Sequence, residues 1–235
     1  MSVLIGPGWT IGPGWTIGTD GGAPSVLYGS TAFVTNKYIS TQNSQLSPGT
    51  GDFTYEFWTY YNSGAGAVFN IAGGVGGTFG ILLNYTASNL TLSWGTGGSW
   101  TQSGVILQSM SSLQNVWKHH AFVRNGSTIN YYINGSSVYT ISDSTNINLP
   151  VGVLEIGAQT RNIAYFNGSI SNFRAVIGTA VYTSGFTVPT SPLSVITNTK
   201  ILTCYSPTSA TYDLTGINTI SNYGSSIPSS ANPFI

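Results

Sequence analysis

Apolar and polar residues alternate with a period of two in short segments along most of the chain. In segment 53–61, the side chains of Phe53, Tyr55, Phe57 and Tyr61 fall on one face of an extended strand. Turns rich in Gly, Asn and Ser separate such segments, and no window shows the 3.6-residue period of an amphipathic helix. The predicted strands are 53–61, 79–83, 90–94, 117–124, 128–133, 138–141, 153–156, 168–176 and 200–204.

Two Asn-Gly pairs give the clearest local prediction. They occupy positions 125–126 and 134–135, each between runs of β-branched and aromatic residues. Asn-Gly suits the two-residue hairpin turn in which both central residues have a positive φ. The three segments between 117 and 141 are therefore predicted to form an antiparallel meander. Short strands without helices predict an all-β fold, an antiparallel two-sheet β-sandwich.

The N-terminal residues repeat a six-residue unit. Ile5-Gly-Pro-Gly-Trp-Thr10 is followed by the identical segment 11–16, and a third copy stops after Gly18. Gly and Pro in each unit exclude a helix, and two copies are too few for a stacked solenoid. We therefore expect an extended arm over 1–19 and the sandwich over 20–235. The arm would pack on a partner, on a sister subunit or on its own domain. Its predicted partner-binding residues are Ile5, Trp9, Ile11, Trp15 and Ile17.

Charged residues are scarce, at 5% of the chain, and the formal net charge is zero. An average globular domain has about 25%. Polarity comes instead from 31 Ser, 29 Thr and 19 Asn. The absence of a basic cluster argues against nucleic-acid binding and against attraction to an anionic membrane. No stretch approaches the ~18 apolar residues of a membrane span. So few acids and bases also argue against an enzyme.

Other signals concern the compartment. The N-terminus lacks a basic region before its short apolar run, so we expect no signal peptide and folding in a cytoplasm. The single cysteine, Cys204, lies in an apolar stretch and is expected to be a buried structural thiol. Of the five Asn-x-Ser/Thr sequons, the three Asn-Gly-Ser sites at Asn125, Asn134 and Asn167 are interpreted as turns.

Four motifs carry a family resemblance that covers roughly residues 25–235. Asp52–Trp58 resembles the early strand of laminin-G-like, concanavalin A-like sandwich domains. Trp117–Arg124 resembles their W-x-H-x-A-x-x-R strand, and Tyr131–Gly135 their x-Y-x-D/N-G hairpin. Phe166–Arg174 resembles their closing F-x-G-x-I-x-x-x-R strand. The resemblance implies a jelly-roll sandwich, a fold that hosts lectins, glycosidases, adhesion modules and structural parts.

The C-terminal part is similar to a version of this domain in structural proteins of tailed bacteriophages, particularly those of cyanobacteria. The similar segments are Thr179–Pro189, Leu202–Tyr205, Asp213–Asn218 and Ala231–Phe234. The resemblance implies a virion structural protein made in the host cytoplasm, such as a capsid decoration protein anchored by its arm. Its partners would be the major capsid protein or a tail component, and it would occur in repeated copies or as a homo-oligomer. The alternative is a carbohydrate-binding receptor module of a tail or head fibre, which recognises host-surface glycans.

Some relatives with this sandwich are glucanases, whose activity depends on a pair of catalytic carboxyl groups. Retaining glycosidases need two carboxyl groups about 5–5.5 Å apart, and the glucanases place both on one strand in a Glu-x-Asp-x-x-Glu-like run. Here the only glutamates, Glu56 and Glu155, are 99 residues apart. No Gly-x-Ser-x-Gly elbow is present either. We therefore predict no catalytic residue, and Glu56, which alternates with Phe53 and Tyr55, is expected to face solvent.

Metal and cofactor sites are not predicted. His119 and His120 are adjacent on a strand, so they point to opposite faces and cannot bind one metal together. Both are expected to be structural. Many laminin-G-like domains hold a calcium ion at a sandwich edge. If this chain binds calcium, Asp143 is the candidate, because the loop 142–146 offers several further oxygen donors. No acid matches a calcium motif residue by residue.

Glycan binding is the remaining candidate for a binding function. The loop from Trp94 to Trp100 contains two tryptophans separated by Gly, Thr and Ser. A sugar ring stacks on an exposed indole while hydroxyl and amide groups bind its edge. Trp94 and Trp100 are therefore the candidate glycan-binding residues. In the alternative interpretation, Trp94 belongs to the core and Trp100 begins the next strand.

Overall fold

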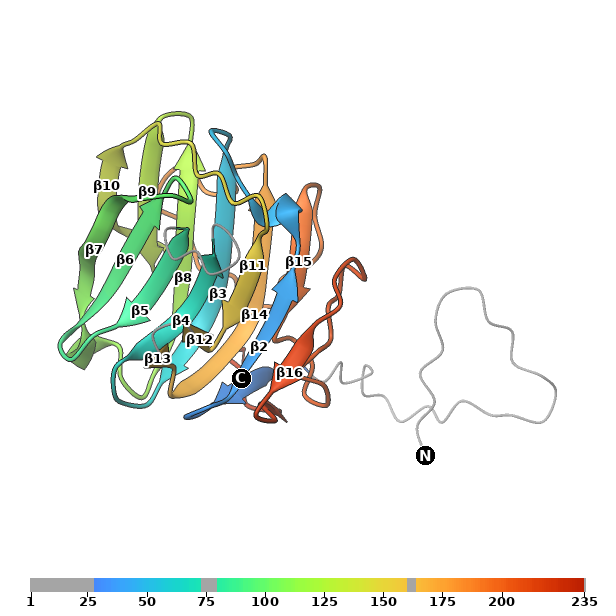
Figure 1. Cartoon of the computed structure of the whole chain (residues 1–235). Helices are drawn as coiled ribbons and strands as arrows, with labels where there is room; N and C mark the ends of the chain where they lie inside the picture. Colours follow the sequence, from blue (N-terminus) through green and yellow to red (C-terminus); the bar gives the residue numbers. More distant parts are fainter. Residues whose placement is uncertain (1–27, 73–79, 160–163, 235) are drawn as a thin grey trace, which may run out of the picture.

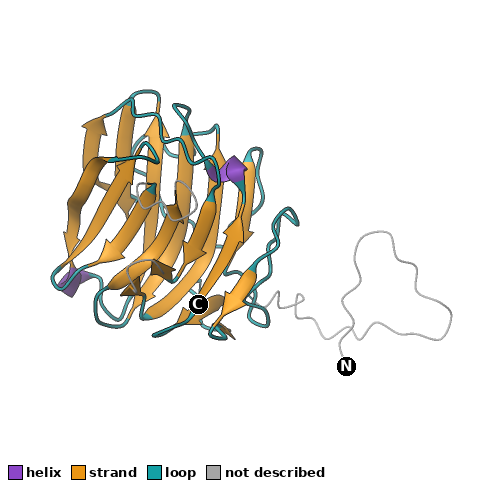
Figure 2. Ribbon diagram, viewed as in Figure 1, coloured by secondary structure: helices purple, strands orange, loops and turns teal. Residues whose placement is uncertain are grey.

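The computed structural model describes residues 28–72, 80–159 and 164–234. The predicted arm and its partner-binding residues lie outside this part of the chain. The described residues form two large antiparallel sheets packed face to face, with only two short 3₁₀ turns, Ser44–Leu46 and Met110–Ser112 (Figures 1 and 2). The predicted all-β, two-sheet sandwich is thereby confirmed. No helix among the described residues is long and apolar enough to cross a membrane.

The first sheet, sheet A, has β3 and β14 at its centre. Its strands are, in order, β10 (Ser136–Ser142), β9 (Thr128–Ile133), β8 (Trp117–Asn125), β3 (Phe53–Tyr61), β14 (Gly168–Ile177), β1 (Ser30–Phe33) and β17 (Ile227–Ser229), and β15 (Thr199–Thr203) also pairs with β14.

The second sheet, sheet B, includes strands that the sequence pattern did not predict, among them β2 and β4. Its strands are, in order, β16 (Ser221–Tyr223), β2 (Tyr38–Gln42), β11 (Val153–Ile156), β4 (Gly66–Ala72), β5 (Ile81–Tyr85), β6 (Asn89–Gly95) and β7 (Trp100–Ser109), and the short β12 (Ala158–Gln159) and β13 (Ala164–Tyr165) pair beside β4.

The core between the sheets is rich in aromatic rings. The four alternating side chains of β3 are all fully buried there, as predicted. The ring of Phe57 lies 5.6 Å from that of Phe69 on sheet B and 5.5 Å from that of Phe173 on sheet A. The Phe57–Phe69 pair joins the two sheets, and offset and edge-to-face aromatic contacts of this kind stabilise beyond the area they bury.

The predicted meander is β8, β9 and β10. Positive φ angles of 59° at Gly126, 49° at Asn134 and 77° at Gly135 form its two turns. Asn134 also accepts, through Oδ1, a hydrogen bond from the backbone N–H of His119 at 2.9 Å. The interpretation of the third Asn-Gly-Ser site as a turn is wrong, since Asn167 directly precedes β14 and is not part of a turn.

The outer sides of the two sheets are covered differently. The segment 178–198 crosses the outer side of sheet A, where Tyr182 and Phe186 pack on Ala121, Val123 and other side chains that point away from the core. Sheet B instead carries two open grooves on its outer side, one over β5, β6 and β7 at one end of the sheet and one at its β2–β16 edge.

Candidate functional site

A buried charged cluster lies under the segment that covers sheet A. Arg174 donates from Nε to Oε1 of Glu56 at 2.9 Å, and the Tyr182 hydroxyl donates to Oε2 at 2.7 Å. Burial opposes the charged form of Glu56, but contacts with His119, Arg174 and Tyr182 hold its pKa below the ordinary value. The prediction that Glu56 faces solvent is therefore wrong. Alternation placed it opposite Phe53, yet the covering segment removes that face from water.

The two adjacent histidines lie on opposite faces, as predicted. His119 Nε2 lies 3.4 Å from Oε2 of Glu56 on the outer side of sheet A. His120 is in the core, where Thr59 Oγ1 is 3.0 Å from Nε2 and the Tyr131 hydroxyl is 3.1 Å from Nδ1. Burial lowers the pKa of His120 to about 3, so its ring is neutral at neutral pH. Both histidines fill structural positions.

Trp94 is fully buried, and its indole Nε1 donates to Oδ2 of Asp143 at 2.9 Å. It therefore offers no face to a sugar, and its prediction as a glycan-binding residue is wrong. The other oxygen of Asp143 accepts the backbone N–H of Thr145 at 2.6 Å. This carboxylate thus holds the core indole and its own loop together, and its role as a calcium ligand stays a prediction.

Most of the charged side chains among the described residues are buried. Arg124 is fully buried and donates to the carbonyl oxygens of Gly49 and Thr145 at 2.9 and 2.8 Å, which ties two loops together. No group of three or more His, Cys, Asp or Glu side chains in the described ranges could hold a metal ion. Six of the ten charged side chains among the described residues are buried: Glu56, Arg124, Asp143, Glu155, Arg174 and Asp213.

A groove that we call the Trp100 groove crosses the outer side of sheet B over β5, β6 and β7. It has a volume of about 620 Å³. Half-buried Trp100 and Ile106, which is 63% exposed, supply apolar surface. The remaining lining is amide, hydroxyl and small apolar groups, without a charged side chain. The lining residues are Leu82, Asn84, Thr86, Asn89, Thr91, Ser93, Trp100, Ser103, Gly104, Ile106 and Gln159.

Internal hydrogen bonds orient the polar floor of this groove. Thr91 Oγ1 donates to Oδ1 of Asn84 at 2.9 Å, which leaves the Asn84 Nδ2 group for a ligand. The backbone N–H of Gly104, which has a φ of 65°, donates to Oγ of Ser93 at 2.8 Å. These bonds fix the donors and acceptors before a ligand arrives, which lowers the entropic cost of binding.

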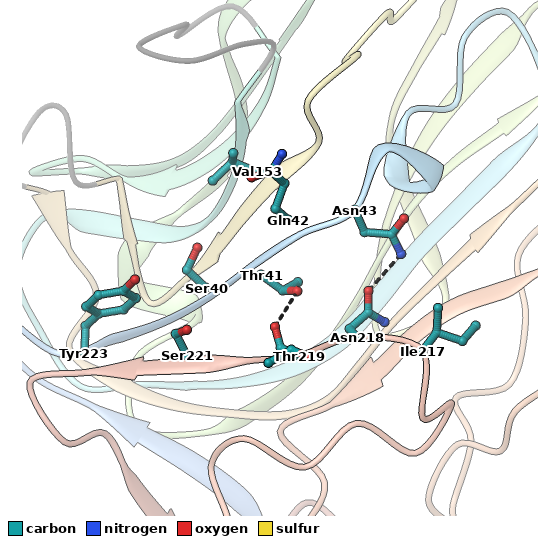
Figure 3. A pocket seen from close by; sticks show the side chains of 10 residues that line it. All are labelled: Ser40, Thr41, Gln42, Asn43, Val153, Ile217, Asn218, Thr219, Ser221 and Tyr223. Carbon is teal, nitrogen blue, oxygen red and sulfur yellow. Dashed lines mark hydrogen bonds between the residues drawn. The ribbon is translucent and has the colours of Figure 1, made fainter.

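A second uncharged groove, the β2 groove, lies at the other end of sheet B and has a volume of about 640 Å³. Figure 3 shows two hydrogen bonds across it, from Asn43 Nδ2 to Oδ1 of Asn218 and from Thr41 Oγ1 to the carbonyl of Thr219, both 2.8 Å. Tyr223 stands at one end and is 46% exposed. The lining residues are Ser40, Thr41, Gln42, Asn43, Val153, Ile217, Asn218, Thr219, Ser221 and Tyr223.

Asp213 shapes the wall of the β2 groove. Its Oδ2 accepts the backbone N–H of Asn218 at 3.0 Å and the Thr215 hydroxyl at 2.6 Å. Its Oδ1 accepts the backbone N–H of Leu202 at 3.1 Å. Sequence reasoning missed this groove, because β2 was not predicted and its wall comes from residues about 175 positions later in the chain. The segment Asp213–Asn218, noted above for its family similarity, was the sequence feature that could have pointed to this groove wall.

Residues 33–178 match the family model Laminin_G_3, described as the concanavalin A-like lectin/glucanases superfamily. No curated protein matches the sequence. Among solved structures, a candidate carbohydrate-binding protein from Bacteroides ovatus matches with a TM-score of 0.52 and 14% identity. The match covers 85% of this chain and 61% of that one.

Two further solved structures are less similar. The heptameric SAP-like pentraxin of Limulus polyphemus has a TM-score of 0.47 and 14% identity, over 68% of this chain and 81% of that one. The ligand-binding domain of botulinum neurotoxin serotype D, in complex with N-acetylneuraminic acid, has a TM-score of 0.48 and 13% identity. This match covers 64% of this chain and 39% of that one. At these identities the structural comparisons concern the fold alone.

Proposed function

Because the chain belongs to the concanavalin A-like lectin/glucanases superfamily, we propose that it is a non-enzymatic module that binds an uncharged oligosaccharide. The observation that carries this proposal is the Trp100 groove. An indole lies there beside fixed hydroxyl and amide groups on an open sheet surface. The Bacteroides ovatus protein, itself a candidate carbohydrate-binding protein, supports the choice of ligand class.

The groove chemistry suits a neutral sugar. The C–H face of a pyranose ring would stack on Trp100, next to the exposed side chain of Ile106. Asn84 and Ser103 would exchange hydrogen bonds with the sugar hydroxyls. Since no charged side chain lines the groove, salt should leave the affinity nearly unchanged.

Hydrolysis is not part of the proposal, because no pair of acids faces the groove. Glu56 is enclosed on the outer side of sheet A, whereas Glu155 belongs to sheet B, where Asn70 Nδ2 donates to it at 3.3 Å. Packed sheets lie about 10 Å apart, which exceeds the separation of about 5–5.5 Å of a retaining glycosidase pair.

A glycan array probed with the full chain tests this function. We expect binding to neutral glycans that is lost in the Trp100→Ala variant. Trp117→Ala is the matched control, because Trp117 is a half-buried tryptophan on the opposite sheet and should leave glycan binding unchanged. Unchanged binding by Trp100→Ala, or a wild-type chain that binds no glycan, would contradict the proposal.

The sequence resemblance supports a second candidate function, a structural protein of a tailed-phage virion. In this proposal the chain is a capsid decoration protein, or a receptor module of a tail or head fibre, in contact with the major capsid protein or a tail component. The supporting observation is the burial of most described charges. An interface on the remaining surface would leave few charges to desolvate.

Quantitative mass spectrometry of purified virions tests this second function. We expect the protein in a fixed copy number, with incorporation reduced in a Trp9→Ala/Trp15→Ala variant. A Thr10→Ala/Thr16→Ala variant is the control, because it changes the same repeats and keeps both indoles. Absence of the protein from virions would exclude the virion role, and full incorporation of the tryptophan variant would exclude the arm as its anchor.

A further inference from the structure

An aromatic pocket, distinct from both grooves, lies on the outer side of sheet A and has a volume of about 510 Å³. This volume falls within the roughly 300–1,000 Å³ that is usual for ligand pockets. Strands β3 and β8, the covering segment and the C-terminal segment form its walls. Its apolar lining is Trp58, Trp117, Val188, Pro189, Pro233 and Phe234.

The aromatic walls of this pocket are held in place by one another. The ring of Phe234 meets that of Trp58 edge to face at 5.0 Å, and Trp117 meets Tyr60 at 5.6 Å. The backbone N–H of Phe234 donates to Oδ1 of Asn232 at 3.0 Å, which fixes the C-terminal wall. Trp117 and Phe234 remain partly exposed, so the pocket presents rigid apolar surface to an occupant.

The described chain begins beside this pocket. Nδ2 of Asn232, the residue that positions Phe234, donates to the carbonyl oxygen of Tyr28 at 3.3 Å. The ring of Tyr28 also meets that of Tyr205 at 5.5 Å. The described chain therefore begins, at Tyr28, next to the C-terminal wall of the aromatic pocket.

The residues of the N-terminal repeat have side chains that suit the apolar lining of the aromatic pocket. Each copy of the repeat places a tryptophan after Gly-Pro-Gly, and no charge occurs before Asp20. Indole and proline rings pack well on aromatic walls, and glycine lets the backbone approach closely. The 12 residues between Trp15 and Tyr28 span up to ~40 Å when extended, which is more than enough to return to the pocket.

We propose that the aromatic pocket is the docking site of the chain's own N-terminal arm and that an indole of the repeat fills it. The pocket next to the arm's own root is favoured over that of another molecule, because a short tether gives an effective concentration on the order of millimolar. The repeat supplies two equivalent occupants, Trp9 and Trp15. Either one fills the pocket when the other is missing. Anchoring of the same indoles on a partner requires them to leave the pocket first.

Indole N–H signals in ¹H–¹⁵N NMR spectra of the full chain test the proposal. In a Trp9→Ala/Trp15→Ala variant we expect the signals of Trp58 and Trp117 to shift, while that of the core residue Trp94 stays in place. Each single variant should keep the wild-type shifts of Trp58 and Trp117, with the docking constant reduced about twofold. Unchanged signals in the double variant would overturn the proposal.

Pocket-side variants and dilution complete the test. Trp117→Ala should shift the signals of Trp9 and Trp15, whereas Trp100→Ala, on the opposite sheet, should not. The shifts should not depend on protein concentration, because docking is intramolecular. Shifts that disappear on dilution, together with a dimer in sedimentation velocity, would contradict the proposal and assign the pocket to the arm of a second copy.

Discussion

The outer sides of the two sheets use polar side chains in opposite ways. On sheet A, the ion pair of Glu56 with Arg174 is enclosed beneath a covering segment, and Tyr182 of that segment donates to the same carboxylate. On sheet B, neutral residues such as Asn84 and Thr91 bond one another and stay accessible along an open groove.

This difference shows where a chain with few charges places them. A buried carboxylate is tolerated only when its partners stay in position, so the Glu56 cluster holds a long loop on sheet A. Hydroxyl and amide groups lose less on desolvation and can be exposed or covered by a ligand. Charge therefore serves the structure beneath the covering segment of sheet A, and the neutral polar groups along the Trp100 groove of sheet B stay accessible.

Breaking the ion pair under the covering segment should have the largest effect. Glu56→Gln leaves Arg174 buried without its counter-charge, and we expect the free energy of unfolding to fall by about 3–5 kcal/mol. Urea denaturation measures this loss. A Glu56→Leu/Arg174→Leu double variant removes both charges and should recover part of the stability. A loss below ~1 kcal/mol for Glu56→Gln would mean that the cluster does not hold the segment.

Removal of the carboxylate that binds the core indole should have a smaller effect. Asp143→Ala deletes the acceptor of Trp94 Nε1 and of the Thr145 N–H, and it should cost about 1.5–3 kcal/mol in unfolding free energy. Trp94→Phe removes the same bond from the donor side. In a double-mutant cycle the two losses should not add, and additive losses would show that the bond contributes nothing.

Acid pH should destabilise the sandwich through its core histidine. The pKa of His120 is lowered from 6.5 to about 3 by burial, so the unfolded chain binds a proton in this window that the folded chain does not. Its contribution is complete above about pH 6.5 and is lost as the pH falls toward 3.

Between about pH 6 and 5 the wild type should lose about 1 kcal/mol more unfolding free energy than a His120→Asn variant, which lacks the titrating ring. Urea denaturation at each pH measures the slopes. The lowered pKa of Glu56 acts in the same direction but only below its ordinary value of 4.5, so this window isolates His120. Equal slopes would contradict the prediction.

The smallest effect on stability is expected on the open side of sheet B. Ile106 is 63% exposed, so Ile106→Ser should change the unfolding free energy by no more than about 0.5 kcal/mol. The same variant should weaken any glycan binding, because Ile106 lines the Trp100 groove. Thermal unfolding and glycan titration together check this prediction. A large loss of stability would show that the groove wall is part of the fold.

Parts of this arrangement could be predicted from sequence because they depend on neighbouring residues. Alternation along β3 assigned four of its six aromatic side chains to the core, and adjacency placed the two histidines on opposite faces. Asn-Gly pairs marked both turns of the meander, although the first turn consists of Gly126 and Ser127 and leaves Asn125 in β8. Trp100 was identified as a candidate, although its companion Trp94 proved to be core.

Other parts depend on contacts between distant residues. Glu56 is covered by Tyr182, 126 positions away, so its alternation correctly indicated the face but not the burial. Thr41 bonds the carbonyl of Thr219 across 178 positions, and no local pattern marks the groove between them.

The sequence by itself determined the all-β class, the core faces of the long strands, and a chemistry with almost no charge, because these follow from residue types and their period. Only the tertiary structure decided which polar groups are enclosed and which stay open. That outcome depends on where the segment 178–198 and the C-terminal segment come to lie on the two sheets. Burial is a property of this packing, and no residue carries it alone.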